Sequence, residues 1–279
     1  MRRLLAILLL LFCLCTAQGQ ALVRLPGTSA TLECYPADTS HLSPFTSHLA
    51  VVVCPGGSYS WHDYKVEGVE VAQWLQAHGI AAYVLRYRVQ GWWAWATHYR
   101  LLFRGNQYPD PLRDAEAALD WLAVHADSLA IDPRQIGVMG FSAGGHLAML
   151  TTYTRRPAFV VPVYPVVTMR QACCHSRSRR ALLGEYGKNN QSLRDSLSIE
   201  LHVRPDCPPV FLVNCVDDPI VDYHNSVLLD SALTANNISH RYIQYRTGGH
   251  GFGMSETKGS PECRPWKEEF LKWIKGLYK

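Results

Sequence analysis

Short apolar runs alternate with amphipathic stretches along most of this chain. Residues 49–54 and 80–85 are continuous apolar runs, which are typical of strands buried on both faces of a parallel sheet. Residues 30–35 alternate apolar and polar side chains, as a strand with one buried face does. Further strands are expected at residues 136–139, 159–164, 210–214 and 241–245, and helices at residues 67–78, 111–122, 223–235 and 265–278.

From residue 49 onward, the predicted strands and helices follow one another in turn. This alternation predicts a single α/β domain in which parallel strands are joined by right-handed helical crossovers. The chain has 279 residues, of which 48% are hydrophobic, enough to form one well-packed domain of this class. Residues 88–108 break the pattern and are expected to be irregular, while residues 168–206 predict polar loops with short helices.

The first 19 residues differ in character from the rest of the chain. They begin with Met1-Arg2-Arg3, continue with an apolar run over residues 4–14 and end in small residues up to Gly19, a pattern typical of a secretory signal peptide. The apolar run is too short to span a bilayer comfortably, and a buried N-terminal helix is the alternative. We therefore expect a signal peptide at residues 1–19 and one domain over residues 20–279. The protein would be secreted or periplasmic, with no stable membrane insertion once the signal is removed.

Charge and cysteine content narrow the choice of partners. The chain holds 27 Lys and Arg against 23 Asp and Glu, and loss of the two arginines in residues 1–19 leaves 25 against 23. This balance gives no support to a nucleic-acid partner.

Of nine cysteines, two lie in residues 1–19, so seven remain and at least one is expected to be free or to pair between chains. Their spacing shows no metal signature, and we expect neither a metal nor a cofactor.

Ser142 is the most informative residue. It lies in the motif Gly-Phe-Ser-Ala-Gly at residues 140–144, directly after the predicted strand 136–139 and before a predicted helix over residues 146–150. Such a strand–turn–helix exposes the serine hydroxyl above the sheet, and the helix N-terminus beneath it favours negative charge. The motif alone is common in turns without chemistry, so the prediction of a nucleophile depends on partners elsewhere in the chain.

A serine nucleophile needs a base and an acid that orients the base. His250 is the candidate base, because it lies between glycines directly after the predicted strand 241–245. The candidate acids follow the preceding strand, where Asp217, Asp218 and Asp222 lie close together, and they could equally cap the next helix. The order of serine, acid and histidine along the chain is that of α/β-hydrolases.

Donors for a developing oxyanion are expected from two turns. The backbone N–H of Ala143 lies at the start of the helix after Ser142, and Gly57 and Ser58 lie in a turn after the strand 49–54. Glycine allows backbone N–H groups to point toward a developing negative charge. A tight turn without chemistry is the alternative for residues 56–58.

Several of these segments resemble one family. The motifs Cys-Pro-Gly-Gly-Ser-Tyr at residues 54–59, Asp-Asp-Pro-Ile-Val at 217–221 and Gly-His-Gly-Phe at 249–252 are similar to α/β-hydrolase esterases grouped with acetyl xylan esterases and other carbohydrate esterases. The resemblance covers roughly residues 49–275. It implies an α/β-hydrolase fold with a mostly parallel central sheet, and Ser142, Asp218 and His250 as the catalytic residues. Two departures are Ser58, where the family has a third glycine, and Asp222, where it has a proline.

The resemblance also implies a function. We expect a serine carboxylic-ester hydrolase that removes small acyl groups, acetyl above all, from a small-molecule or glycan ester; an exopeptidase of the same fold and an inactive glycan-binding relative are the alternatives. Tyr59, Trp92, Trp93 and Trp95 are the predicted substrate contacts, because aromatic faces stack on sugar rings. A lid that packs its own aromatic side chains is the alternative for residues 91–95. The sequence leaves the oligomeric state open.

Overall fold

The computed structural model of the protein describes residues 14–15, 21–38, 40, 46, 48–97 and 104–278. Most of the predicted signal peptide, and residues 98–103 of the tryptophan-containing segment 88–108, lie outside this part of the chain. Leu14–Cys15 forms a two-residue strand, β1, which pairs antiparallel with the strand that follows it.

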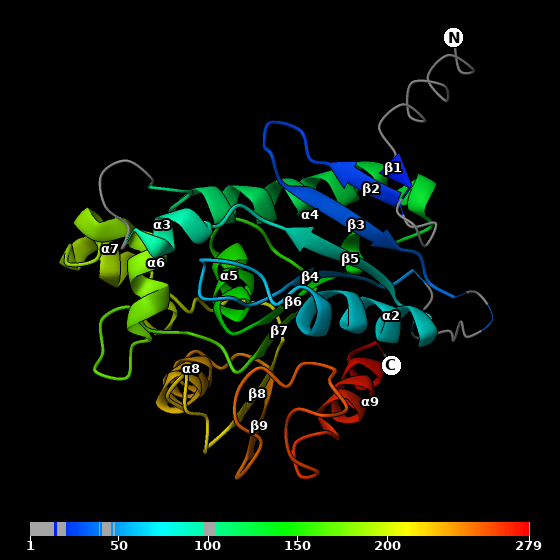
Figure 1. The fold of residues 1–279 in the computed structure, drawn as a ribbon. Coiled ribbons are helices and arrows are strands. Elements are labelled where there is room, and N and C mark those ends of the chain that lie inside the picture. Colours follow the sequence, from blue (N-terminus) through cyan, green and yellow to red (C-terminus); the bar gives the residue numbers. More distant parts are fainter. Residues whose placement is uncertain are drawn as a thin grey trace.

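Nine strands within the described residues form one sheet, in the order β1-β2-β3-β5-β4-β6-β7-β8-β9 (Figure 1). After β1 they are β2 (Ala21–Arg24), β3 (Thr31–Tyr35), β4 (Ala50–Cys54), β5 (Ala81–Arg86), β6 (Ile136–Phe141), β7 (Val160–Val163), β8 (Val210–Cys215) and β9 (His240–Tyr245).

The strand pairing confirms the predicted parallel sheet. Every pair from β5 across to β9 is parallel, whereas β1, β2 and β3 join the β5 side antiparallel. Strands β4, β6, β7 and β8 are buried along their whole length, as their continuous apolar sequences predict. The sequence analysis missed β2, an outer strand whose residues are only half-buried and whose sequence carries no strong alternation.

Helices cover both faces of the sheet. They are α2 (Glu70–Ala77), α3 (Trp92–Ala96), α4 (Asp110–Leu129), α5 (Ala143–Leu150), α6 (Ser176–Gly187), α7 (Gln191–Ser196), α8 (His224–Ala235) and α9 (Trp266–Leu277). Helices α2 and α9 pack on one face, against side chains such as Val51, Val53 and Phe211 (Figure 1). Helices α4, α5, α6 and α8 pack with the opposite face, around Val52 and Leu212. Alternate residues of each strand therefore enter different cores, as in an α/β domain with helices on both faces of its sheet.

Two segments differ from their predicted structure. The helix expected at residues 67–78 begins as a short π-helix, Lys65–Val69, and continues as α2. The segment expected to be irregular over residues 88–108 contains the one-turn helix α3. Among the residues that the structure describes, no helix is both long enough and apolar enough to cross a bilayer.

A buried carboxylate on α4 holds this helix against the loop after β5. Asp114 is fully buried and accepts hydrogen bonds from the Arg88 backbone N–H at 2.6 Å and from its guanidinium Nε at 3.0 Å. The hydroxyl of Thr28, in the turn before β3, also donates to Asp114. One carboxylate thus joins α4 to two segments at the antiparallel side of the sheet.

We predict that Asp114→Asn lowers the free energy of unfolding by about 2 kcal/mol, because it removes a fully buried charge that accepts several hydrogen bonds, while Asp110 at 3.1 Å remains as a partner of Arg88. Urea unfolding measures the change. Asp120→Asn on the same helix is the matched control: Asp120 pairs with Arg155 at the surface, where such a pair contributes at most about 1 kcal/mol. Equal losses in the two variants would contradict the role assigned to Asp114.

Candidate active site

Ser142 lies in a strained turn between β6 and α5. Its backbone angles are φ 54° and ψ −119°, outside the regions that L-residues favour and costing on the order of 1–3 kcal/mol. The turn is held by its neighbours, since the Ser142 N–H donates to the carbonyl of Val163 at 3.0 Å and the Ser142 carbonyl accepts from Val166 at 3.1 Å. These contacts fix the hydroxyl at the carboxyl end of the sheet.

The structure brings Ser142, His250 and Asp218 together. The Nε2 atom of His250 lies 2.9 Å from the Ser142 hydroxyl oxygen, and its Nδ1 atom lies 2.6 Å from a carboxylate oxygen of Asp218. Because a carboxylate only accepts, Nδ1 carries the hydrogen and Nε2 is left to accept the serine proton. The Asp218 side chain is 1% exposed. Its second oxygen accepts from the N–H groups of Ile220 and Val221 at 2.8 and 2.9 Å, so the carboxylate is fixed on both sides.

The other two candidate acids have different partners. Asp217 accepts a hydrogen bond from the N–H of Gly249 at 2.8 Å, which ties the acid loop to the histidine loop. Asp222 accepts from the backbone N–H of His224 at 2.9 Å and contacts its ring at 2.7 Å, at the start of α8. Only Asp218 of the three contacts His250 among the described residues.

The turn that holds Gly57 and Ser58 lies close to Ser142. A Cβ built on Gly56 would stand 3.0 Å from the Ser142 Cβ, so the turn after β4 passes directly beside the serine. Gly57 and Ser58 follow with φ values of 131° and 58°. The N–H of Ala143, the first residue of α5, has no partner within the helix. The turn after β4 and the first turn of α5 therefore both adjoin the serine, and Gly57, Ser58 and Ala143 remain the predicted donors.

Tyr59 requires a correction. Its side chain is 1% exposed, and burial leaves it no surface for the predicted contact with substrate. The Tyr59 hydroxyl instead lies 2.7 Å from Nδ1 of buried His146, whose Nε2 lies 2.8 Å from the carbonyl of Leu197. A carbonyl only accepts, so Nε2 carries the hydrogen and Nδ1 accepts from Tyr59. Burial lowers the pKa of His146 to about 4. The neutral ring holds Tyr59, the residue that follows Gly57 and Ser58, through this hydrogen bond.

The sequence analysis assigned no role to Glu67 or Tyr164, which lie beside the site. Glu67 accepts a hydrogen bond from the N–H of Gly56 at 2.8 Å and from the hydroxyl of Tyr164 at 2.8 Å. The ring of Tyr164 in turn packs on that of His250, with ring centres 4.7 Å apart. A glutamate in an otherwise apolar helical face was a sequence signal for this contact.

The structure describes part of the segment 88–108, in which three tryptophans were predicted to contact substrate. Trp92 and Trp93 on α3 are 58% and 67% exposed, and their rings meet edge to face with centres 5.1 Å apart. The side chain of Trp95 lies outside the described part of the structure. Exposed indole faces are compatible with either of the two roles considered for this segment.

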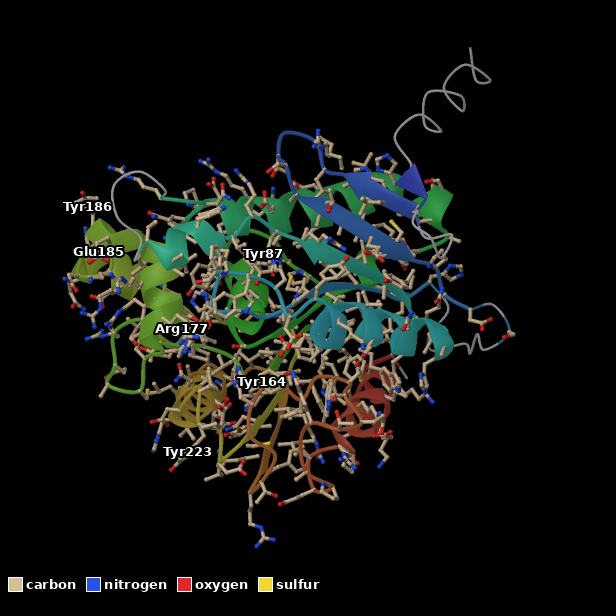
Figure 2. The ribbon with its side chains drawn as sticks, in the orientation of Figure 1. Tyr87, Tyr164, Arg177, Glu185, Tyr186 and Tyr223 are labelled. Carbon is tan, nitrogen blue, oxygen red and sulfur yellow. The ribbon has the colours of Figure 1, made fainter. Side chains whose placement is uncertain are left out.

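The N-terminal end of helix α6 lies near the segment that follows the oxyanion turn. Arg177 lies at its start with its guanidinium 5.8 Å from the ring centre of Trp61, a residue in the segment that follows the oxyanion turn. Glu185 and Tyr186 lie at the opposite end of α6 (Figure 2). Over the described ranges, no group of three or more His, Cys, Asp or Glu is arranged to hold a metal ion, and the seven cysteines after residue 20 are thiols.

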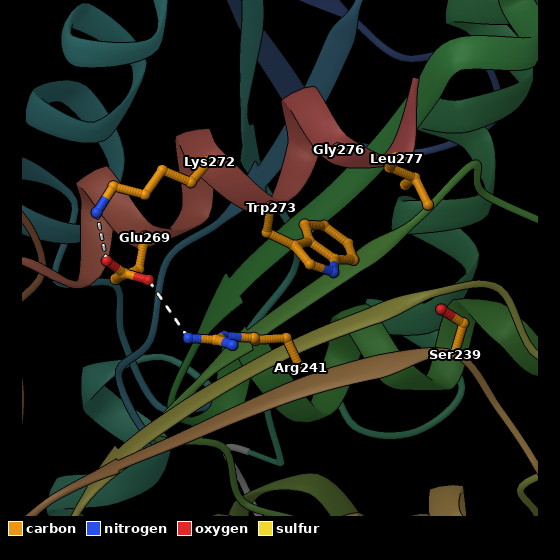
Figure 3. A pocket seen from close by; sticks show the side chains of 7 residues that line it. All are labelled: Ser239, Arg241, Glu269, Lys272, Trp273, Gly276 and Leu277. Atoms are coloured by element: carbon orange, nitrogen blue, oxygen red, sulfur yellow. Dashed lines mark hydrogen bonds and ion pairs between the residues drawn. The ribbon is translucent and has the colours of Figure 1, made fainter. Parts of the chain in front are cut away.

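A separate groove of about 420 Å³ lies between β9 and α9 (Figure 3). Glu269 there pairs with Arg241 at 3.5 Å and with Lys272 at 2.6 Å. Ser239 lines the groove just before β9 begins, at the strand end opposite to the one that His250 follows. The groove is therefore distinct from the serine site.

A serine in a strand–turn–helix, with acid and histidine loops after later parallel strands, defines an α/β-hydrolase. A family model named BD-FAE matches residues 50–233. The chain is 32% identical to an acetylxylan esterase from Xylanibacter ruminicola over 74% of its length, and 27% identical to endo-1,4-beta-xylanase B from Butyrivibrio fibrisolvens over 74%. The matched regions span 41% and 32% of those relatives.

A solved structure agrees with these matches. The acetyl ester-xyloside bifunctional hydrolase from Caldicellulosiruptor lactoaceticus superposes with a TM-score of 0.77 at 31% identity, covering 90% of this chain and 89% of that one. The protein belongs to the BD-FAE family, and its resemblance to α/β-hydrolase esterases is confirmed.

We predict that Gly57→Ala slows the labelling of Ser142 by a fluorophosphonate about 10²-fold. A Cβ at this position would collide with the carbonyl of Trp61 and displace backbone donors, whose loss costs 10²–10³ in rate. Mass spectrometry of the intact protein measures the labelling rate. Gly27→Ala is the control, because Gly27 also has a positive φ but no heavy atom within 4 Å of its Cβ position. Comparable slowing in both variants would refute the assignment of this turn.

Proposed function

We propose that the protein is a secreted serine esterase that removes acetyl groups from carbohydrate esters through an acyl-enzyme. The observation that carries the proposal is the relay from Ser142 through His250 to Asp218, with both hydrogen bonds at 2.9 Å or shorter, beside backbone donors from two turns. Such an arrangement supplies a base, an orienting acid and an anion site at one point.

The geometry supports the following reaction. The Ser142 oxygen attacks the ester carbonyl while Nε2 of His250 takes the hydroxyl proton, and the N–H groups of Gly57, Ser58 and Ala143 stabilise the oxyanion. The tetrahedral intermediate expels the sugar alkoxide, which receives the proton from His250 and leaves an acetyl-serine. Water then attacks the acetyl-serine with His250 again as base, and release of acetate restores the serine. Asp218 orients the imidazole through its contact with Nδ1 and stabilises the imidazolium.

The substrate class is supported by the relatives and by α3. The curated relative with 32% identity is named an acetylxylan esterase, and the solved relative with 31% identity is named an acetyl ester-xyloside hydrolase. Trp92 and Trp93 offer exposed aromatic faces on which a sugar ring would stack. Residues 1–19 have the pattern of a signal peptide, which supports export of the protein.

We predict that Ser142→Ala abolishes acetate release from acetylated xylo-oligosaccharides, with a loss of at least about 10⁴-fold, because no other group replaces the nucleophile. Acetate release and fluorophosphonate labelling are measured on the same preparation. Ser128→Ala, an exposed serine on α4, is the control and should retain full activity.

Two results would decide against the proposal. A wild-type protein that hydrolyses aminoacyl arylamides but not acetylated sugars would favour the exopeptidase. A folded wild-type protein that neither releases acetate nor reacts with the fluorophosphonate would favour the inactive glycan-binding relative.

A second prediction tests the carbohydrate specificity. The double variant Trp92→Ala, Trp93→Ala should raise KM for acetylated xylo-oligosaccharides about fivefold to tenfold, since an aromatic contact contributes about 1 kcal/mol. KM for p-nitrophenyl acetate, which lacks a sugar, should stay within about twofold. Tyr186→Ala, an exposed aromatic residue at the far end of α6, is the control for general surface effects. An equal rise in KM for both substrates would assign α3 to a lid rather than a sugar platform.

A further inference from the structure

Glu67 is a buried carboxylate that the proton relay does not use. It lies on the π-helix after the oxyanion turn and is 2% exposed. A buried ionisable group is costly unless it is well partnered, so its contacts indicate what it does.

Each carboxylate oxygen of Glu67 holds a different part of the site. Oε2 accepts a hydrogen bond from the N–H of Gly56 at 2.8 Å, and Gly56 lies between Glu67 and Ser142. Oε1 accepts from the hydroxyl of Tyr164 at 2.8 Å. That hydroxyl accepts in turn from the N–H of Gly253 at 2.9 Å, in the loop that carries His250. One side chain therefore joins the oxyanion turn to the histidine loop.

The hydrogen-bond pattern matches the ionised form of Glu67. The backbone N–H of Gly56 can only donate, so Oε2 must present a lone pair. The Tyr164 hydroxyl already accepts from Gly253 and uses its own hydrogen toward Oε1. A proton on Oε1 would reverse the bond to Tyr164, and a proton on Oε2 would weaken the bond from Gly56, because a neutral carboxyl oxygen is a poorer acceptor than an ionised one.

The groups around Glu67 set its titration. Burial raises the pKa of Glu67 to about 7, while the hydrogen bond from Tyr164, the nearby His250 and the N–H of Gly56 act in the opposite direction. Asp63, from the turn before the π-helix, raises it further, and Tyr87 also lies within electrostatic range. Protonated and ionised forms are therefore both populated near neutral pH.

We propose that ionised Glu67 is a positioning residue for the esterase reaction, holding the oxyanion turn through Gly56 and the histidine loop through Tyr164. The proposal rests on the proposed function and adds a second group that must be deprotonated for activity. Below neutral pH, protonation of Glu67 weakens or reverses one of its two bonds and loosens one side of the site.

Ionisation of Glu67 affects the stability of the fold in the opposite direction to its effect on activity. The pKa of Glu67 is raised above its ordinary value, so between about pH 4.5 and 7 the native state binds more protons than the unfolded state. The contribution of Glu67 to stability therefore falls as pH rises through this window, whereas the activity that depends on its ionised form rises. A glutamate with only a structural role would change stability with pH but would not change kcat.

The test compares pH profiles of wild type and Glu67→Gln. For wild type, log(kcat/KM) on p-nitrophenyl acetate should fall with a slope steeper than one on the acid side, because two groups must be deprotonated. Glu67→Gln should show a slope of one. Its kcat at pH 8 should be about 10-fold to 100-fold lower with KM nearly unchanged, less than deletion of an oxyanion donor costs. Glu67→Gln should also lose the fall in stability between pH 4.5 and 7, measured by urea unfolding.

Three variants serve as comparisons. Glu67→Asp keeps a carboxylate and should restore part of kcat and the steep acid limb. Tyr164→Phe removes only the link to the histidine loop and should lower kcat by itself. Glu70→Gln is the matched control, because Glu70 begins α2 three residues later and its nearest charged partner is Lys65 at 3.9 Å; it should behave as wild type.

A Glu67→Gln variant with wild-type kcat and an unchanged acid limb would overturn the proposal. If Glu67→Gln does not fold, as circular dichroism would show, Glu67→Asp and Tyr164→Phe take its place, and wild-type kcat in both overturns the proposal. Failure of the proposed function is recognised separately: the folded wild-type protein would then show neither ester hydrolysis nor labelling of Ser142, and the role of Glu67 would fall with it.

Discussion

Parallel pairing from β5 across to β9 is the constraint on which the site depends. It places the carboxyl ends of β4, β6, β8 and β9 at one edge of the sheet, where the loops after them carry the oxyanion turn, Ser142, Asp218 and His250. Residues 108 positions apart in sequence, Ser142 and His250, thereby come within hydrogen-bond distance. Helices on both faces exclude water from the sheet and keep its strands in register.

Burial gives the polar groups at this edge their properties. Asp218, Glu67 and His146 are withdrawn from water, and each is hydrogen-bonded to groups inside the protein. The carboxylate of Asp218 receives hydrogen bonds from two backbone N–H groups besides His250. His146 is kept neutral by burial and bonded at both ring nitrogens. Because an unmatched buried polar group would cost free energy, these contacts favour one arrangement of the loops.

Backbone strain is concentrated at the same place. Ser142, Ser58 and Tyr59 all have positive φ values, which are uncommon for residues other than glycine. The two cores beneath the site, one on each face of the sheet, hold these residues in place. Such strain is stable only where the surrounding structure determines the conformation, and here it directs a hydroxyl and backbone N–H groups toward one point.

The sequence by itself determined the class of fold and most of the candidate site. Buried parallel strands require continuous apolar runs, and the order of Ser142, the acid loop and His250 follows from the strands that precede them. The choice of Asp218 over Asp217 and Asp222 on geometric grounds, the burial of Tyr59, and the contact of Glu67 with Tyr164 were decided only by the tertiary structure. Local patterns report which side of an element faces the core, whereas these features depend on hydrogen bonds between loops up to 97 residues apart, whose directions no local pattern contains.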